Sequence, residues 1–524
     1  MRPFRPLRRL LSHLDAFFDR VYGWRYNPLY QSGTIAVLLL VVLIVTGTYL
    51  LLFYRIGSPY ASVERIQDQV WTGRWIRALH RYASDAAVVA IAVHALRMFL
   101  RGRSWGPRAL AWVSGVGLLG LIFVIALTGF VMVWDVQGRY LAMEGARLLD
   151  ALPIFSEPVA RAFTGERPMP GAFFFLNYFL HIAVPLGIAL FLYLHVARIA
   201  RPRLLPPRGL AWGVVGGLTF LSVLWPAPLP PRADPSLLLQ KVPLDWFFGF
   251  WVPVSQSLSP GLAWLVGGGV VLGVLTVPLW SAPRGAARPG PSTVEERHCT
   301  GCVQCTLDCP YDAITMVPRT DGRQGLMASV TPEYCVSCGI CAGSCAPMSI
   351  GPPGRTGRDQ LVTVRRFLEK RAPGPRDVVL LACARGAGEV GGMERFQGAM
   401  VYPADCIGSV HTSVAEYLLR GGAGGVLFAA CPERDCWNRE GTKWARARLF
   451  EGREAELKER VDRNRLRFFE GGAAERGALA AAVDDFRELV HRRAPGVGEQ
   501  DEPPEPECER PAPEAMDERV EAGS

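Results

Sequence analysis

The stretch from Trp75 to Arg103 reads WIRALHRYASDAAVVAIAVHALRMFLRGR and decides the fold of the first half of the chain. It is mostly apolar, is long enough to cross a membrane as a helix, and carries His80 and His94. The two histidines are fourteen residues apart. At about 100° per residue this interval is within about 40° of whole turns, and it spans roughly 21 Å. The pattern therefore predicts one helix with two imidazoles on the same face.

A second apolar segment, from Phe173 to Arg201, repeats the interval with His181 and His195. Two such helices packed side by side form two cross-helix histidine pairs, one near each membrane surface. Each pair can bind a planar macrocycle through neutral imidazole nitrogens. A lone intramembrane histidine is as readily a hydrogen-bonded core residue or a proton relay. Two pairs with equal spacing, which include every histidine of the apolar region, favour ligation.

The motif Arg77-Ala78-Leu79-His80 resembles the start of the haem-binding helix in cytochrome b of the quinol-oxidising bc-type complexes. Glycines repeat the fourteen-residue interval, and glycine lets a haem lie against the backbone. These glycines are Gly33, Gly47, Gly115 and Gly129. Thr128-Gly129-Phe130 and Trp134 also resemble that family, over about residues 25–280.

The resemblance implies two b haems, with quinone or menaquinone as substrate. His80 and His181 are the expected ligands of the outer haem, and His94 and His195 those of the inner haem. Arg77 is the expected contact of a haem propionate, and the four glycines are the expected haem-packing positions. A homodimer is implied by the resemblance alone.

Composition separates a membrane half from an aqueous half. Of 524 residues, 50% are hydrophobic, yet the apolar runs stop near Trp280. The net charge of +9 is mostly arginine, which in a membrane protein indicates loop charges facing an anionic lipid surface. No nucleic-acid motif is present, so we expect the membrane rather than nucleic acid as the partner of these charges.

We predict six transmembrane spans in a domain over residues 33–280. They are 33–54, 76–100, 110–134, 174–200, 209–226 and 261–280. The arginine-rich segments lie on one side, which identifies that side as the cytoplasm. We expect residues 1–32 to form an amphipathic surface segment rather than a signal peptide. The N-terminus and everything after residue 280 are then cytoplasmic, on the inner membrane of a cell.

The loop before the last span contains Pro243-Leu244-Asp245-Trp246-Phe247-Phe248. It loosely resembles the Pro-Glu-Trp-Tyr signature of the outer quinol site in the bc family, where the acid accepts a proton. Here an extra residue precedes the acid, and the acid is Asp. Asp245 is therefore a candidate quinone-site acid, and an interfacial belt of Trp and Phe is the alternative reading.

After a linker over 281–297 comes a cysteine pattern of three close thiols plus one, repeated once. All thirteen cysteines follow residue 298, which favours metal ligation in a reducing compartment over disulfides. Residues 298–350 resemble a bacterial two-cluster ferredoxin, in which the fourth cysteine of each run ligates the other cluster. Zinc would favour two cysteine pairs instead. One [4Fe–4S] set is Cys299, Cys302, Cys305 and Cys345, and the other is Cys335, Cys338, Cys341 and Cys309.

Residues 376–490 read as an α/β domain with parallel strands. Expected strands are 378–382, 400–403 and 425–430, with helices over 411–420, 441–463 and 476–492. Each strand is followed by a cysteine, at the edge where such folds place their sites. Asp405-Cys406-Ile407-Gly408 and Cys431-Pro432-Glu433-Arg434-Asp435-Cys436 resemble the delta subunit of methyl-viologen-reducing hydrogenase. That resemblance implies a [2Fe–2S] cluster on Cys383, Cys406, Cys431 and Cys436.

The family commonly has a second cysteine near the position of Cys383, which this chain lacks. Zinc on the same four cysteines, or buried structural cysteines, are the alternatives. Residues 494–524 are rich in Pro and Glu, so we predict a disordered acidic tail in which Cys508 is a free thiol without function.

The predicted fold is multidomain: an all-α transmembrane di-haem bundle, a ferredoxin-like α+β domain, an α/β iron–sulfur domain and a tail. The centres follow the order outer haem, inner haem, two [4Fe–4S] clusters, [2Fe–2S] cluster. We predict an electron-transfer subunit of a quinone-linked oxidoreductase complex. Its soluble partner would be a flavoprotein or a subunit like those of heterodisulfide reductase or hydrogenase.

Two alternatives remain open at this stage. One is a membrane anchor that recruits a soluble redox enzyme without turnover through the membrane. The other is a bc-like quinol-oxidising core that needs a Rieske partner. The direction of electron flow is also open, although the low reduction potential that is usual for ferredoxin-type clusters favours flow of electrons from the cytoplasm to quinone.

Overall fold

The computed structural model describes most of the chain. The described residues are 4–154, 157–163, 169–197, 203–234, 242, 245–282, 290–384, 386, 398–472 and 475–493. The predicted disordered tail with Cys508, residues 283–289 of the predicted linker, and Pro243 and Leu244 lie outside them.

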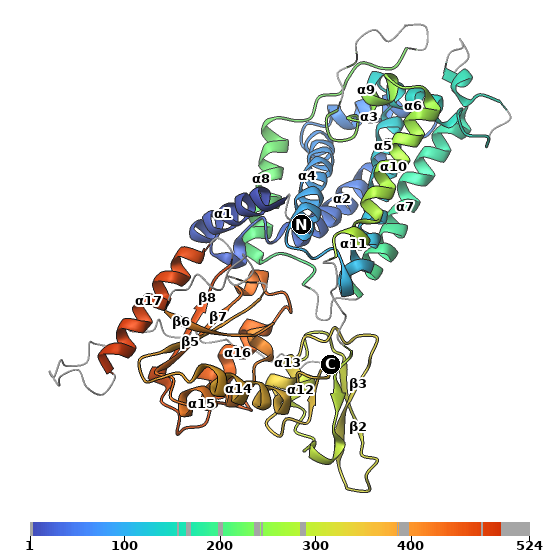
Figure 1. Cartoon of the computed structure of the whole chain (residues 1–524). Helices are drawn as coiled ribbons and strands as arrows, with labels where there is room; N and C mark the ends of the chain where they lie inside the picture. The colour runs from blue at the N-terminus through green and yellow to red at the C-terminus, as the bar shows by residue number, and fades with distance from the viewer. Residues whose placement is uncertain are drawn as a thin grey trace, which may run out of the picture.

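Four long apolar helices form the centre of the membrane half: α2 (Ser32–Phe53), α4 (Gly73–Leu100), α5 (Ala109–Val133) and α7 (Gly171–Ala197). Helix α2 packs along α4, and α5 packs along α7 (Figure 1). Within the described residues these four are long and apolar enough to cross a membrane. The prediction of spans is confirmed for these four helices. We call the end of the bundle that carries His80 the outer end, and the end that carries His94 the inner end.

Two shorter apolar helices accompany the four, α8 (Arg208–Leu224) and α10 (Pro260–Leu275). With 17 and 16 residues they are roughly 25 Å long, against a hydrocarbon core of about 30 Å. Helix α8 packs along the inner part of α4, since Gly209 lies beside Tyr26 at the inner end and the Trp225 carbonyl accepts from Tyr82 farther toward the outer end. Spans five and six stay a prediction.

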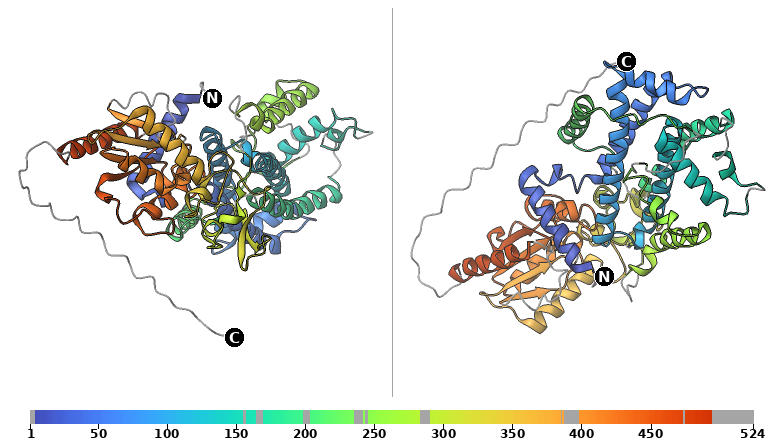
Figure 2. Two further views of the ribbon diagram at one scale, coloured as in Figure 1. Left: turned by 60° about the horizontal axis from the view of Figure 1, so that its bottom comes forward. Right: turned by 90° about the horizontal axis from the view of Figure 1, so that it is seen from above.

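Several short helices were not expected from the sequence. At the outer end they include α3 (Pro59–Asp68), α6 (Val136–Leu149) and α9 (Val252–Gln256), and α11 (Val277–Trp280) follows α10. Helix α1 (Arg5–Tyr22) lies at the inner end, on the side of the soluble domains (Figures 1 and 2). Short 3₁₀ turns are η2 (Trp24–Tyr26), η3 (Gly106–Arg108), η4 (Val159–Phe163), η5 (Glu296–His298), η8 (Ile407–Ser409), η9 (Glu433–Asp435) and η10 (Arg463–Arg465).

The ferredoxin-like part is built from two antiparallel strand pairs and two short helices. Strand β1 (Thr293–Val294) pairs with β4 (Ile350–Gly351), and β2 (Ile314–Pro318) pairs with β3 (Leu326–Val330) in the register Ile314 to Val330. Helices α12 (Gln304–Leu307) and α13 (Ile340–Gly343) each follow the first cysteines of a run. Helix α14 (Gly357–Arg371) then leads to the last domain and begins with a capping box of Thr356 and Asp359.

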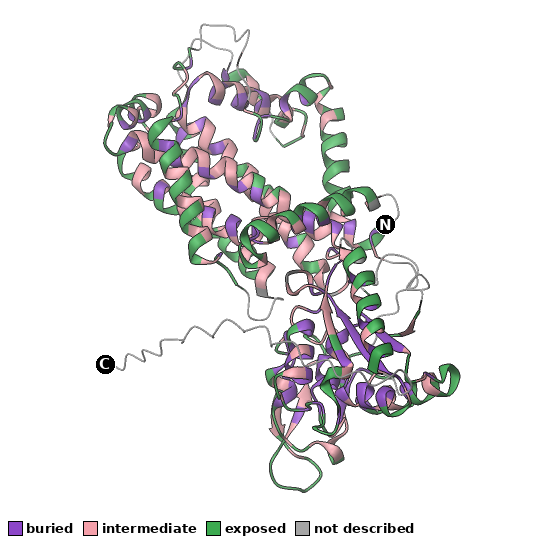
Figure 3. Cartoon of the chain, turned by 90° about the vertical axis from the view of Figure 1, so that its left-hand side faces the viewer, coloured by how far each residue is buried: buried purple, intermediate pink, exposed green. Residues whose placement is uncertain are grey.

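The C-terminal domain is a parallel sheet in the order β6-β5-β7-β8. Its strands are β5 (Val378–Ala382), β6 (Ala399–Tyr402), β7 (Gly425–Ala430) and β8 (Leu466–Glu470). Strands β5 and β7 are fully buried, as expected for central parallel strands. Helix α17 (Arg476–Arg493) covers one face, and α14 and α15 (Thr412–Arg420) pack on the other. Burial is concentrated in this sheet, whereas the membrane helices expose their outward faces (Figure 3).

Two expectations for this domain need correction. The helix expected over 441–463 is α16 (Gly441–Phe450) and ends early, because Gly452 and Ala455 take positive φ angles of 67° and 61° that a helix does not allow. The fourth strand, β8, was not expected, because its charged residues hide the strand pattern.

Candidate functional site

The structure brings the four bundle histidines together in two pairs between α4 and α7. The ring centroids of His80 and His181 are 6.4 Å apart, and those of His94 and His195 are 6.3 Å apart. Each pair joins helices that are far apart in sequence, at opposite ends of the bundle. The spacing predicted from the fourteen-residue interval is thus present in three dimensions.

The Nδ1 atoms of three of these rings contact neighbouring helices. His181 Nδ1 lies 2.9 Å from the Ile125 carbonyl oxygen, which only accepts, so Nδ1 donates. This hydrogen bond fixes the tautomer and leaves Nε2 with a free lone pair, the form that binds a metal. The other Nδ1 contacts are His80 to Thr46 Oγ1 at 2.9 Å and His195 to Ser114 Oγ at 3.2 Å.

The four predicted glycines lie against the histidine rings themselves. A Cβ added at Gly129 would lie 2.9 Å from His181 Cε1, and one added at Gly33 would lie 2.8 Å from His94 Nδ1. The same holds for Gly47 with His80 and Gly115 with His195, each at 3.2 Å. The sequence suggested room for a haem. The structure shows that the missing side chains make room for the imidazoles, so α2 and α5 hold the rings of α4 and α7 in place.

The residues present fit a bis-histidine haem at each pair. A centroid separation near 6.3 Å leaves a metal–nitrogen bond of about 2 Å on each side plus the distance from each nitrogen to its ring centre. Arg77 is placed at the outer end, where its Nε donates to Gln67 Oε1 at 2.8 Å and its guanidinium contacts the Ala227 carbonyl. Its assignment to a propionate stays a prediction.

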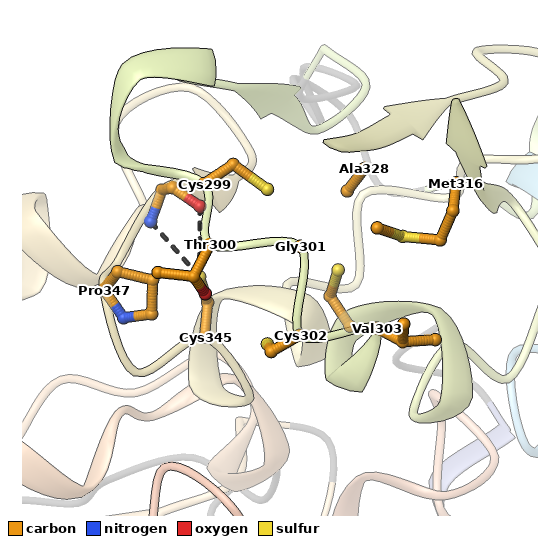
Figure 4. Close-up of a pocket in the computed structure, with 11 residues that line it drawn as sticks. Cys299, Thr300, Gly301, Cys302, Val303, Met316, Ala328, Cys345 and Pro347 are labelled. Atoms are coloured by element: carbon orange, nitrogen blue, oxygen red, sulfur yellow. Dashed lines mark hydrogen bonds between the residues drawn. The ribbon is translucent and has the colours of Figure 1, made fainter. Parts of the chain in front are cut away.

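The first cysteine set surrounds one hollow of about 300 Å³, a volume that includes its open side. Figure 4 shows this pocket with Cys299, Cys302 and Cys345 around it. Cys305 also lines it, so the fourth cysteine of the second run joins the first three of the first run. The second hollow, of about 310 Å³, is lined by Cys309, Cys335, Cys338 and Cys341. The exchange of the fourth cysteines between the two runs matches the predicted ligand sets.

Burial in the second hollow affects the ionisation of its thiols. Burial raises the pKa of the Cys341 thiol to about 12 and that of Cys338 well above its usual range. Such thiols are protonated at neutral pH unless positive charge offsets the thiolates, and the iron of a cluster would supply that charge. Backbone N–H groups point at two sulfurs of the set: Ala313 N lies 3.4 Å from Cys309 Sγ and Ser292 N lies 3.3 Å from Cys335 Sγ.

The four cysteines of the α/β domain, Cys383, Cys406, Cys431 and Cys436, meet at the C-terminal edge of the parallel sheet. Cys383 follows β5 and interacts with Cys406 and Cys431. A Cβ added at Gly441 would lie 3.0 Å from Cys406 Sγ and 3.4 Å from Cys436 Sγ, so these two sulfurs face the same point. All four are buried. Within the described residues no group of three or more His, Cys, Asp or Glu is gathered tightly enough to hold a single metal ion.

Asp245 lies at the outer end of the bundle, and both of its carboxylate oxygens have partners. Its Oδ1 accepts from Phe247 N at 3.0 Å and Phe248 N at 2.7 Å, and its Oδ2 pairs with Arg81. Arg81 directly follows His80 on α4, so the predicted acid contacts the same turn of the helix that carries an outer histidine. Arg81 Nε is also 3.4 Å from Asp85 Oδ2.

Sequence reasoning missed Arg81 and Asp85 as members of this cluster. The Oδ1 atom of Asp85 is buried and, among the described residues, has no hydrogen-bond partner. The signal was available, since an acid inside an apolar helix is costly and is usually kept for function. The inner end holds a second missed group of charges, which involves Asp15, Arg97 and Asp435.

Three family models match separate parts of the chain. Cytochrome b/b6/petB matches residues 20–202, the 4Fe-4S dicluster domain matches 298–347, and the delta subunit of methyl-viologen-reducing hydrogenase matches 379–492. All three resemblances are therefore confirmed. With the four apolar helices, the first match indicates a multi-pass membrane protein with haem b, and the second implies 4Fe–4S clusters.

Individual proteins are also similar to parts of this chain. The menaquinol:cytochrome c reductase cytochrome b subunit of Geobacillus thermodenitrificans is 25% identical over 206 residues, which are 35% of this chain and 92% of that protein. A chain of the solved structure titled "Hyperthermophilic respiratory Complex III" is 17% identical with a TM-score of 0.39, over 48% of this chain and 75% of that chain.

Proposed function

We propose that this chain, which resembles a cytochrome b, a two-cluster ferredoxin and a hydrogenase delta subunit in turn, links the quinone pool to a cytoplasmic redox partner by electron transfer. The observation that carries the proposal is the occurrence, in one chain, of two histidine pairs at haem spacing and three four-cysteine sets, of which the C-terminal set is buried throughout. The cofactors, when bound, supply the electron-transfer chemistry. The protein's own residues bind, orient and insulate them.

Each set of ligands has a defined place in the proposal. His80 and His181 hold the outer b haem, and His94 and His195 hold the inner one. The two ferredoxin-like sets hold [4Fe–4S] clusters, and Cys383, Cys406, Cys431 and Cys436 hold a [2Fe–2S] cluster. The match to a hydrogenase delta subunit supports a soluble flavoprotein, or a subunit like those of heterodisulfide reductase or hydrogenase, as the partner.

The outer quinone site is proposed at the cluster of Asp245, Arg81 and Asp85. Two of its members lie on α4 within five residues of His80, which supports this placement, because a quinone there would exchange electrons with the outer haem. The name of the curated relative, a menaquinol:cytochrome c reductase subunit, supports menaquinone as the quinone.

Orientation follows from the arginines at the inner end, which support a cytoplasmic location for both iron–sulfur domains. Moving one electron across the whole membrane is worth about 2.3 kcal/mol per 100 mV. We propose flow from the cytoplasm to quinone, a direction in which the membrane potential assists the transfer to the outer end.

Loss of the inner histidine pair tests the proposal against the alternative, a membrane anchor that recruits a soluble enzyme without electron transfer through the membrane. In His94→Leu, reduction of quinone by the iron–sulfur clusters should stop, while the clusters and the outer haem remain. Persistent transfer without the inner haem would contradict the proposed route and favour the anchor. A high-potential iron–sulfur protein in the purified complex would instead favour a quinol-oxidising core with a Rieske partner.

A further inference from the structure

One loop of the soluble half contacts the end of the helix that carries His94. The loop runs from Cys431 to Cys436 and includes Asp435. Asp435 Oδ1 is 2.8 Å from Arg97 Nη2, and its Oδ2 is 3.1 Å from Arg101 Nη2. The Arg97 side chain is 2% exposed and that of Asp435 is 8% exposed, although the two residues are 338 positions apart. The contact is therefore a buried interdomain ion pair.

The N-terminal helix completes the charge balance. Asp15 of α1 is fully buried and pairs with Arg97 at 2.5 Å and with Arg101 at 2.6 Å. Asn27 Nδ2 also donates to Asp15. Two arginines thus meet two carboxylates in one network, which joins α1, α4 and the Cys431–Cys436 loop. Removing one member of a buried network leaves an uncompensated charge, so the network strongly favours one relative position of its three elements.

The loop that follows α4 holds the same segment by its backbone. Arg103 Nη2 donates to the Cys436 carbonyl at 3.0 Å, and Arg108 Nη2 donates to the Trp437 carbonyl at 3.2 Å. The rings of Trp105 and Trp437 are 5.8 Å apart. Arg108 also interacts with Tyr311 of the ferredoxin-like part, which is therefore a second, flanking contact.

We propose that the Cys431–Cys436 loop is the docking element of the soluble half, and that Arg97 and Asp435 are positioning residues that keep the C-terminal four-cysteine site beside the inner histidine pair. Arg97 is three residues, about one helical turn, after His94, and Asp435 directly precedes Cys436. The assignment of cofactors to these sites rests on the proposed function, whereas the docking contact does not.

The opposite side of the same site faces the second ferredoxin-like set. A Cβ added at Gly343 would lie 2.8 Å from the Gly408 carbonyl, and one added at Gly339 would lie 3.0 Å from Ser409 Cβ. Arg439 Nη1 donates to the Pro310 carbonyl, next to Cys309, at 2.5 Å. The four-cysteine site therefore lies between the inner histidine pair and the second set.

This arrangement changes the order of sites expected from the sequence, in which the [4Fe–4S] clusters precede the [2Fe–2S] cluster. In the proposed order the C-terminal site is the neighbour of the inner haem. In each transfer a cluster on the C-terminal four cysteines would be oxidised by one electron, and the ferric iron of a haem held by His94 and His195 would be reduced to ferrous. No bond forms or breaks.

The docking contact is tested by hydrogen–deuterium exchange on the full-length protein in detergent, comparing Asp435→Asn with Glu433→Gln. Glu433 is in the same loop, but its carboxylate faces Arg446 of its own domain at 3.9 Å. In Asp435→Asn we expect faster exchange in both residues 101–108 and 432–439, by roughly 100-fold if the buried pair sets the docked population. Glu433→Gln should change neither segment. Unchanged exchange in residues 101–108 of Asp435→Asn would overturn the docking.

The position of the site is tested by pulsed electron paramagnetic resonance on oxidised protein that is frozen first and then partly reduced by irradiation in the frozen state, so that an electron placed on the C-terminal site cannot equilibrate with the ferric haems. We expect the ferric inner haem to speed the spin relaxation of that site, an effect that His94→Leu abolishes, Asp435→Asn weakens and His80→Leu leaves intact. Equal relaxation in His94→Leu and His80→Leu would overturn the proposed order. If Cys436→Ser removes no iron–sulfur signal, the cluster assignment of the proposed function fails, and the exchange result still decides the docking.

Discussion

At the scale of single residues, two glycines, which lack a Cβ atom, shape the proposed haem sites. Gly129 of α5 and Gly33 of α2 each leave space that a histidine ring of the neighbouring helix fills. Both rings are thereby fixed by backbone contact, and the ring of His181 is also fixed by its hydrogen bond to the Ile125 carbonyl, which gives the rigidity that ligation needs.

Gly129→Ala should therefore displace His181 and release the outer haem. The added Cβ would lie 2.9 Å from the ring, closer than real Cβ contacts allow, and both groups are held by helix backbones. Haem content per chain should fall by about half, measured by the pyridine haemochrome spectrum. Gly120→Ala on the same helix is the matched control, since nothing lies within 4 Å of its added Cβ. Full haem content in both variants would contradict this role of Gly129.

Asp245→Asn tests the proposed quinone-site acid at the same scale. The amide oxygen can still accept from the Phe247 and Phe248 N–H groups, so the turn is preserved, but the proton-accepting carboxylate is lost. We expect quinol-driven haem reduction to slow by about 100-fold, the usual effect of losing a general base. Asp150→Asn is the control, because Asp150 accepts from Val159 N and Ala160 N in another outer loop. Equal rates in the two variants would contradict a role of Asp245 as proton acceptor and would leave it only the structural role of accepting the N–H groups of its turn.

At the scale of elements, the ferredoxin-like part and the α/β domain are joined by a buried charge. Asp308 is fully buried and accepts from Arg453 Nη2 at 2.7 Å and Ser344 Oγ at 2.7 Å. Arg448, buried on α16, is 3.7 Å from the same carboxylate and donates to Gly408 O at 2.6 Å. This group holds α12, α13 and α16 together, and so fixes the distance between the cysteine sets.

Asp308→Asn should destabilise the soluble half by about 3 kcal/mol or more, because Arg448 would stay buried without its counter-charge. The measurement is the urea midpoint of the α/β domain, followed by exchange protection of β5 and β7. Asp405→Asn is the control: its carboxylate is 71% exposed and pairs with Arg355, so its loss should cost no more than about 1 kcal/mol. Equal midpoints for the two variants would show that the domains do not depend on this buried charge.

At the scale of the whole molecule, the soluble domains lie beneath the inner end of the bundle (Figure 1). An anaerobic redox titration, with visible spectra for the haems and paramagnetic resonance for the clusters, tests the direction of flow. We expect the clusters to titrate well below both haems, so that electrons run downhill from the cytoplasm to the membrane. Clusters level with or above the haems would contradict that direction and indicate quinol oxidation. Absence of a bis-histidine haem signal would contradict the proposed haem sites.

The sequence by itself determined the features that repeat at short range. Helical periodicity placed His80 and His94 on one face of their helix, and likewise His181 and His195 on theirs. The cysteine triplets identified the ferredoxin-like sets. Both patterns depend only on local geometry. The buried strands β5 and β7 were equally legible as apolar runs. The charged edge strand β8 could not be predicted, because its pairing with β7 overrides the local pattern. The early end of α16 could not be predicted either, because it depends on positive φ angles.

Only the tertiary structure decided which separate segments meet. Asp435 meets Arg97 across 338 residues, and Asp245 meets Arg81 across 164. No period or motif links such positions, because their contact depends on how whole helices and domains pack. For the same reason the linear order of the motifs does not show that the loop of the C-terminal cysteine site contacts the end of α4, the helix that carries His94.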